Sequence, residues 1–188
     1  KASTGERVWH YQLIHHGLWD YDLPTAPNLL DVVIDGRLVK AQAQVSKQGF
    51  IYTFDRETGE PIWPIEERPV PTDTNIPGEQ PWPTQPYPTR PAPFDYQGVV
   101  EDDLADFTPE IRQMALKAVE GYRLGPLYTP QMRNDGEVKG LLFRPTGAGG
   151  GNWSGAGVDP ETGILYVPSK NSAGVLSFYQ PDNGNLLY

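Results

Sequence analysis

The sequence predicts an all-β fold built from short antiparallel strands that are joined by many turns. The chain holds 20 glycines and 20 prolines among its 188 residues, a composition that favours frequent turns. It also holds 5 Trp, 10 Tyr and 6 Phe, which is too many aromatic side chains for a disordered segment. In addition, one turn phrase recurs along the chain, which indicates repeated structural units.

The recurring phrase is a Thr-Gly pair followed three or four residues later by an aromatic residue. It occurs at residues 3–9, 55–63 and 159–166, with a fainter copy at 181–188. A turn of this kind is typical of a hairpin, in which an Asp side chain bonds back to the turn, Gly adopts a positive φ and the aromatic ring anchors the next strand. The glycines of the clear copies are separated by 54 and 104 residues. These spacings predict a β-propeller or a similar array with one insertion.

The first repeat unit contains expected strands at residues 8–13, 32–34, 38–46 and 50–54. Asp35-Gly36 is a strong hairpin signal between the second and third of these strands. A turn at residues 47–49 separates the last two. Four strands in about fifty residues make one four-stranded antiparallel propeller blade.

Residues 64–139 are predicted to be a proline-rich loop and helix inserted into a single partial β-propeller domain at 1–188. Residues 61–93 include 11 prolines, too many for a central strand, and the aromatic residues among them favour a long loop pinned to a surface over a flexible linker. Thr108 as N-cap and Pro109 at the first helical position then predict a helix over 109–122.

The stretch at residues 15–22 crowds two imidazoles, two carboxylates and two aromatic rings into a short segment. In an extended chain, Asp20 and Asp22 point to one face while Trp19 and Tyr21 point to the other. One face could then hold a cation or a proton while the other packs. A solvated acidic turn is the alternative at this stage.

The densest glycine run, at residues 147–157, lets the backbone approach a flat ligand or another strand closely. A phosphate loop is excluded because no Gly-Lys-Ser/Thr follows and the run leads into a strand rather than a helix. Asn152 can offer an amide to a carbonyl ligand, and Trp153 can offer a ring for stacking. Both are therefore candidate cofactor contacts, with a turn role for Asn152 and core packing or surface exposure for Trp153 as the alternatives.

Charge and composition exclude several classes of function. The formal net charge is -9 and no run of Lys or Arg is present, which argues against nucleic-acid or anionic-membrane binding. No apolar run approaches the roughly 18 residues of a membrane span, and the N-terminus has no signal-peptide pattern. The chain has no cysteine, so disulfides, thiolate metal sites and a Cys nucleophile are excluded.

Three segments resemble the pyrroloquinoline quinone (PQQ)-dependent dehydrogenases, especially the glucose- and alcohol-oxidising quinoproteins. They are residues 15–27 with their Trp-Asp-Tyr-Asp core, residues 47–63 (KQGFIYTFDRETGEPIW) and residues 149–169 (GGGNWSGAGVDPETGILYVPS). The resemblance implies an eight-bladed propeller of four-stranded blades, of which this chain supplies about three plus the insertion. It also implies a periplasmic oxidoreductase that acts on CH-OH groups and carries PQQ and a metal ion.

The resemblance implies roles for individual residues. Asp20 matches the catalytic carboxylate, which takes the alcohol proton while hydride leaves the carbon. Lys47 matches the cation that stabilises negative charge on the quinone oxygens, and Asn152 matches an amide that bonds the cofactor. Asp20 and Asp22 are the implied metal ligands. Ca²⁺ is the expected ion, with a lanthanide or Mg²⁺ also open, and it would polarise the quinone carbonyl.

The resemblance also implies groups that this chain lacks, namely a further metal-binding Glu and Asn and a tryptophan beneath the cofactor. The chain begins at Lys1, after those groups, so we expect the isolated chain to be incomplete and inactive. The implied partners are a sugar or alcohol substrate, the remainder of the propeller or another chain, and an electron acceptor such as a cytochrome or a membrane quinone.

Two other functions remain open from the sequence. A non-catalytic β-propeller binding or assembly module would keep the repeats without bringing Asp20, Lys47 and Asn152 together. A glycosidase that uses Asp20 and an acid such as Glu101 has only its two carboxylates in its favour.

Overall fold

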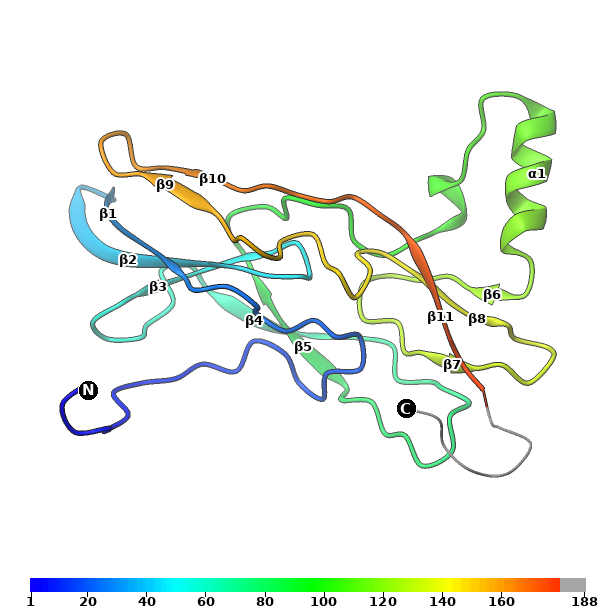
Figure 1. Cartoon of the computed structure of the whole chain (residues 1–188), viewed down its shortest axis with the longest axis horizontal. Helices are drawn as coiled ribbons and strands as arrows, with labels where there is room; N and C mark the ends of the chain where they lie inside the picture. The colour runs from blue at the N-terminus through cyan, green and yellow to red at the C-terminus, as the bar shows by residue number, and fades with distance from the viewer. Residues whose placement is uncertain (180–188) are drawn as a thin grey trace.

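The computed structural model describes residues 1–179, and within them the chain is mostly strand and loop with one α-helix. The fourth, fainter copy of the turn phrase, at 181–188, lies outside the described residues. Figure 1 shows an elongated molecule whose strands form several small sheets, with the helix standing at one end.

The first sheet follows the predicted hairpin signals. It is antiparallel with the order β1-β2-β3, formed by β1 (Asn28–Ile34), β2 (Arg37–Val45) and β3 (Ile51–Asp55). Asp35 and Gly36 both have positive φ, 50° and 76°, as a two-residue hairpin turn requires. The Ser46 N–H donates to the Phe50 carbonyl at 3.0 Å, with Gly49 at φ 84°. Both predicted turns are therefore confirmed.

The remaining strands form three further sheets. Two are antiparallel pairs, β4 with β5 and β9 with β10, and the third has the order β6-β8-β11-β7. The strands are β4 (Ile65–Pro69), β5 (Thr84–Pro88), β6 (Tyr122–Arg123), β7 (Met132–Arg133), β8 (Gly140–Phe143), β9 (Gly157–Asp159), β10 (Ile164–Tyr166) and β11 (Gly174–Phe178).

The prediction of four-stranded antiparallel blades is wrong for the described residues. The first sheet has three strands, and the four-stranded sheet contains the parallel pairs β6·β8 and β11·β7. The strand expected at residues 8–13 is not formed. The rings of Trp9 and Tyr11 lie 5.7 and 5.1 Å from that of Phe54, so this segment contacts the sheet through its side chains and not through a ladder of backbone hydrogen bonds.

The repeated turn has the same geometry in its three described copies. In each copy a glycine with φ between 70° and 82° donates its N–H to the carbonyl four residues earlier, at 2.8 to 2.9 Å. The Asp side chain bonds back to the turn as predicted, since Asp55 and Asp159 each accept a backbone N–H at 2.9 Å. The pattern in the sequence thus predicted the turns correctly. The predicted hairpin with an anchoring aromatic ring is formed only in part, because no strand follows the turn at 3–9 and Tyr166 is 60% exposed.

The hydrophobic core joins the first sheet to loops that precede and follow it. Trp19 donates its indole N–H to the Thr129 carbonyl at 2.7 Å, and Tyr21 donates its hydroxyl to the Pro145 carbonyl at 2.6 Å. Both bonds are buried, so they fix the segment that carries Asp20 and Asp22. The fully packed members of the core are Leu13, Trp19, Tyr21, Phe50, Tyr52, Phe54, Leu127, Tyr128 and Leu141.

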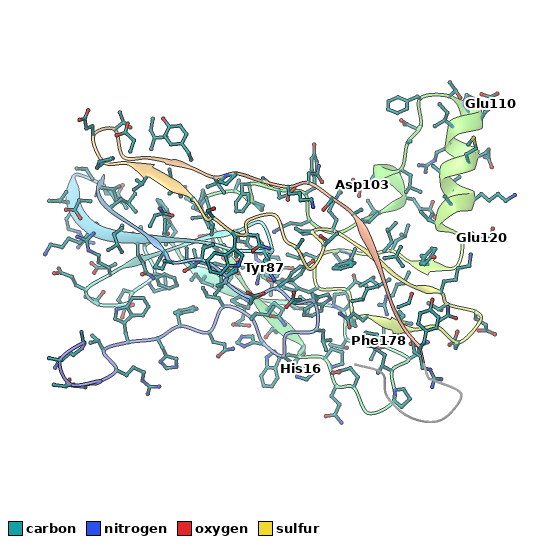
Figure 2. The ribbon with its side chains drawn as sticks, viewed as in Figure 1. His16, Tyr87, Asp103, Glu110, Glu120 and Phe178 are labelled. Atoms are coloured by element: carbon teal, nitrogen blue, oxygen red, sulfur yellow. The ribbon has the colours of Figure 1, made fainter. Side chains whose placement is uncertain are left out.

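The proline-rich stretch is pinned to the body, as expected, but part of it is a hairpin and not a loop. Strands β4 and β5 form a two-stranded sheet. Both are therefore edge strands, where proline is tolerated although it has no N–H to donate. The fully buried Gln85 accepts the His15 N–H at 2.9 Å and donates to the His15 carbonyl at 2.7 Å. Figure 2 shows Tyr87 of this hairpin in the middle of the molecule.

Helix α1 (Pro109–Val119) is shorter than the predicted 109–122, because Tyr122 belongs to β6. No residue of α1 is buried, and Met114 is 71% exposed. Figure 2 shows Glu110 and Glu120 near the two ends of this outlying helix. No helix among residues 1–179 is long and apolar enough to cross a membrane.

Removing the N-cap of α1 should destabilise this helix alone. The Thr108 hydroxyl accepts the Ile111 N–H at 3.2 Å, so Thr108→Ala should cost about 1 kcal/mol of helix stability. Hydrogen exchange of the α1 amides measures the effect, which should leave the exchange of the first sheet unchanged. Thr108→Ser keeps the oxygen and is the matched control, and equal effects of Ser and Ala would contradict the capping role.

Candidate functional site

The side chain of Lys47 lies between the carboxylates of Asp20 and Asp22, which come from an earlier segment of the chain. Its Nζ is 3.1 Å from Asp20 Oδ2 and also forms an ion pair with Asp22. The Lys47 side chain is only 8% exposed, whereas those of Asp20 and Asp22 are 77% and 55% exposed. The cation is therefore covered by the protein, and the carboxylates face solvent.

The alternation predicted for residues 19–22 is confirmed by burial. Trp19 and Tyr21 are buried, while Asp20 and Asp22 are exposed. The segment is not a strand, because Asp20 has a φ of 61°, a left-handed conformation that Asp and Asn adopt more readily than most residues. The buried aromatic rings hold the segment, and the turn at Asp20 exposes its carboxylate.

The glycine loop packs against the turn that carries Lys47. The Gly150 N–H donates to the Lys47 carbonyl at 2.9 Å. A Cβ at Gly149 would lie 2.6 Å from the Lys47 Cα, so no larger residue fits there without movement. Gly147 lies close to Asp20, since a Cβ there would be 3.6 Å from the Asp20 Cβ. The close backbone approach predicted for this loop is therefore confirmed.

The surroundings of Lys47 keep it positively charged. Burial alone would lower the pKa of its ammonium, but the hydrogen bonds to Asp22 and Asp20, together with their negative charges, raise the pKa above its usual value. At neutral pH the group is a fixed cation. Such a cation can pair with the two carboxylates or stabilise an anionic oxygen on a ligand.

Asn152 and Trp153 border a separate hollow of 390 Å³ that also includes Gly149, Gly150, Ser169 and Lys170 among its lining residues. The Asn152 amide donates to the Ala148 carbonyl at 2.6 Å and accepts the Trp153 N–H at 2.8 Å. Its groups are thus used within the loop. Trp153 is 80% exposed, so it is not packed in the core and the alternative of surface exposure is the one confirmed. The structure brings Asp20, Asp22 and Lys47 into direct contact, but it does not bring Asn152 or Trp153 into contact with them.

The other polar residues of the early stretch form surface pairs. His15 pairs with Glu67 and His16 with Glu79, at 2.9 and 2.5 Å. Glu101 begins a short 3-10 helix, η1 (Glu101–Asp103), and borders the hollow beneath α1. Within the described part of the chain, no contact joins Glu101 to Asp20, and the two line no common hollow. Asp20 and Glu101 therefore do not form the carboxylate pair that a glycosidase requires.

One residue near the site is not indicated by any motif in the sequence. Asp95 lies in the insertion expected at residues 64–139, just after the proline-rich residues 61–93. Asp95 contacts both Gly49 and Gly150, which belong to the turn and the loop around Lys47. Only the folded chain brings these segments together, so the spacing of residues could not have identified Asp95.

The carboxylates present can make only part of a cation site. No group of three or more His, Asp or Glu side chains is placed to hold a metal ion among residues 1–179. Ca²⁺ takes six to eight oxygen ligands, and Asp20 and Asp22 supply two carboxylates in one place. The donor chemistry therefore fits a hard cation, provided that further ligands come from outside the described residues.

Comparisons with known proteins give a consistent set of relatives. The chain is 34% identical over 167 residues to a quinate/shikimate dehydrogenase (quinone) from Acinetobacter baylyi, covering 88% of this chain and 20% of that protein. It is 33% identical over 169 residues to the quinoprotein glucose dehydrogenase of Escherichia coli, with the same coverage. A solved quinohemoprotein alcohol dehydrogenase from Comamonas testosteroni is 23% identical with a TM-score of 0.49, covering 92% of this chain and 19% of that one.

The chain thus spans about a fifth of the length of the curated relatives that it matches. The family model for the beta-propeller domain of glucose/ethanol/alcohol dehydrogenases, designated PQQ, matches residues 1–187. This match covers all of the described structure and confirms the resemblance seen in the sequence. The chain therefore belongs to the PQQ-dependent dehydrogenase β-propeller family.

Proposed function

We propose that this chain forms part of a PQQ-dependent dehydrogenase that oxidises a hydroxyl group of a sugar or alcohol. The observation that carries the proposal is the contact of Lys47 with Asp20 and Asp22, which gathers a proton acceptor, a second carboxylate and a cation. The relatives support the reaction class, since their names include quinate/shikimate, glycerol and glucose dehydrogenases. In this proposal the chain is part of an eight-bladed propeller, and the remainder of the protein would complete the blades that the small sheets of the described residues do not form alone.

Asp20 is the proposed base. Lys47 binds its Oδ2 at 3.1 Å, which leaves Oδ1 available to accept the proton of a substrate hydroxyl. Removing that proton as hydride leaves the carbon avoids an unstabilised cation. The exposed position of Asp20 lets a sugar or alcohol reach the carboxylate directly.

Lys47, Asn152 and Trp153 are the proposed cofactor contacts in this chain. When bound, PQQ accepts the hydride, with a hard cation as Lewis acid. The Lys47 ammonium would hold a quinone oxygen, and Asp20 and Asp22 would ligate Ca²⁺, a lanthanide or Mg²⁺. Asn152 and Trp153 border the 390 Å³ hollow, where an exposed indole offers a flat surface to a ring.

The remaining blades are the proposed partner of the chain. Apolar side chains are exposed on β1, β2 and β10, namely Leu29, Val33, Leu38, Ile164 and Tyr166. Covering such a surface with neighbouring blades would stabilise both parts. We further propose a periplasmic location and an electron acceptor such as a cytochrome or a membrane quinone, in line with the word quinone in the names of two relatives.

A non-catalytic β-propeller binding or assembly module is the second candidate. It is favoured by the internal use of the Asn152 amide and by the small number of cation ligands in the described chain. Under this function, the removal of the Asp20 carboxylate would change neither PQQ binding nor turnover.

The 188-residue chain alone should give no dye reduction when PQQ, Ca²⁺ and glucose, glycerol or quinate are added. The reason is that two carboxylates do not complete a calcium site. A chimera that carries the chain in place of the matching fifth of the Escherichia coli quinoprotein glucose dehydrogenase should reduce the dye. Turnover by the isolated chain would overturn the first expectation, and a folded, PQQ-loaded chimera without turnover would overturn the proposed function.

A further inference from the structure

The segment at residues 94–97 contacts the turn that carries Lys47. The Phe94 N–H donates to the Gly49 carbonyl at 2.9 Å, and the Gln97 side chain donates to the Gln48 carbonyl at 2.8 Å. Two hydrogen bonds therefore attach this part of the insertion to the residues that follow Lys47. None of the residues assigned above to base, metal or cofactor binding belongs to this segment.

The Asp95 side chain occupies the space between that turn and the glycine loop. A Cβ at Gly49 would lie 3.0 Å from the Asp95 Cβ, and a Cβ at Gly150 would lie 2.6 Å from the Asp95 Oδ2. Both distances are shorter than ordinary van der Waals contact. Asp95 therefore leaves no room for a side chain at Gly49, two residues from Lys47, or at Gly150, two residues from Asn152.

Gly150 is held in place from two sides. Its N–H donates to the Lys47 carbonyl at 2.9 Å, and its carbonyl accepts the Lys170 N–H at 3.1 Å. The loop therefore has little freedom to move away from Asp95. A change in the volume of the Asp95 side chain should be transmitted to the loop and to the turn, because closely packed groups pass on small displacements.

The hydrogen bonding of Asp95 does not explain its presence. Oδ1 accepts the N–H of the neighbouring Tyr96 at 2.8 Å, whereas Oδ2 is buried without a hydrogen-bond partner among the described residues. An unpaired buried oxygen costs free energy. Oδ2 instead faces Gly150, where any Cβ would collide with it, so we attribute the role of Asp95 to the shape of its side chain.

We propose that Asp95 is a positioning residue, whose side chain holds the Lys47 turn and the glycine loop at a fixed separation. It would thereby set the distance between Lys47 and Asn152, the two groups proposed to contact the cofactor from opposite segments. The consequence of this packing for catalysis rests on the proposed function. The packing itself can be tested without the cofactor.

A double-mutant cycle in the 188-residue chain tests the packing. Gly150→Ala should lower the Tm by about 5 °C, because its new methyl group collides with Asp95. Asp95→Ala removes Oδ2, the atom nearest the new methyl group, so the double variant should lose less than the sum of the two single losses. Gly157→Ala is the matched control: a Cβ at Gly157 has no neighbour within 4 Å and should leave the Tm unchanged. Additive losses would overturn the proposed contact.

The chimera described above tests the link to the site. Asp95→Ala should raise the Kd for PQQ about tenfold, since small displacements of binding groups are costly, and should leave the KM for glucose unchanged. Asp95→Asn keeps the shape and should restore the affinity. If Asp95 were merely structural, Asp95→Ala would lower the Tm but would not change the Kd for PQQ measured below the melting temperature. That outcome would overturn the positioning role. If Asp20→Asn and Lys47→Met leave turnover intact, the proposed function fails instead, whatever Asp95 does.

Discussion

Asp20→Asn is expected to lower dye reduction by the chimera about a thousandfold. The amide has nearly the same shape as the carboxylate, but it cannot accept the substrate proton. The backbone of Asp20 has a φ of 61°, which Asn tolerates about as well as Asp. The substitution therefore removes the chemistry and keeps the conformation, whereas Asp20→Ala would also strain the backbone.

The measurement is kcat for dye reduction with glucose, alongside the Tm and the Kd for PQQ. Asp102→Asn is the matched control, because Asp102 lies in η1, outside the proposed site, and its loss should leave kcat unchanged. Asp22→Asn should act mainly on metal affinity, so added Ca²⁺ should restore most of its activity. Full turnover by Asp20→Asn would rule out Asp20 as the base and favour the non-catalytic module.

The parts of the fold that the sequence predicted well are those determined by neighbours in the chain. The hairpin turn at Asp35-Gly36 requires only positive φ angles at these two residues, and the turn at Asp55 is closed by hydrogen bonds between residues at most five positions apart. The alternation of Trp19 and Asp20 is equally local. For the same reason the cap of α1 at Thr108 was predictable, while the end of the helix, which depends on β6, was not.

The parts that the sequence could not give depend on partners far along the chain. Residues 8–13 have the composition of a strand, yet Trp9 packs on Phe54 and on the turn at Gly59, so side-chain packing replaces strand pairing. The Asn152 amide bonds within its own loop, as the turn role predicts, but the sequence alone could not choose between that role and a cofactor contact. Asp95 becomes a neighbour of Gly150 only through the fold. The site is therefore predictable as a set of residue types and much less so as a set of contacts.

Lys47→Met is expected to lower dye reduction by the chimera by about two orders of magnitude, the usual cost of removing one group that stabilises a developing oxyanion. Met has a similar length, so it can occupy the space that the buried Lys47 side chain fills. The exposed Asp20 and Asp22 can then be solvated by water, and the fold should survive. Lys40→Met is the matched control, since Lys40 lies on β2, the strand that leads into the Lys47 turn, and pairs with Glu57 at the surface.

The ion pairs of Lys47 also predict how stability depends on pH. Because its folded-state pKa is raised above the usual 10.5, the ion pairs contribute their full stability below about pH 10.5 and lose it as the pH rises through the folded-state value. The folded protein also loses stability in the same alkaline range when buried tyrosines ionise, such as Tyr87, whose pKa burial raises to about 12. The informative quantity is therefore the difference in Tm between the chain and its Lys47→Met variant. That difference should be constant from pH 6 to 9 and shrink above pH 10.5, whereas a difference that grew with pH would mean that Lys47 is held as a neutral amine.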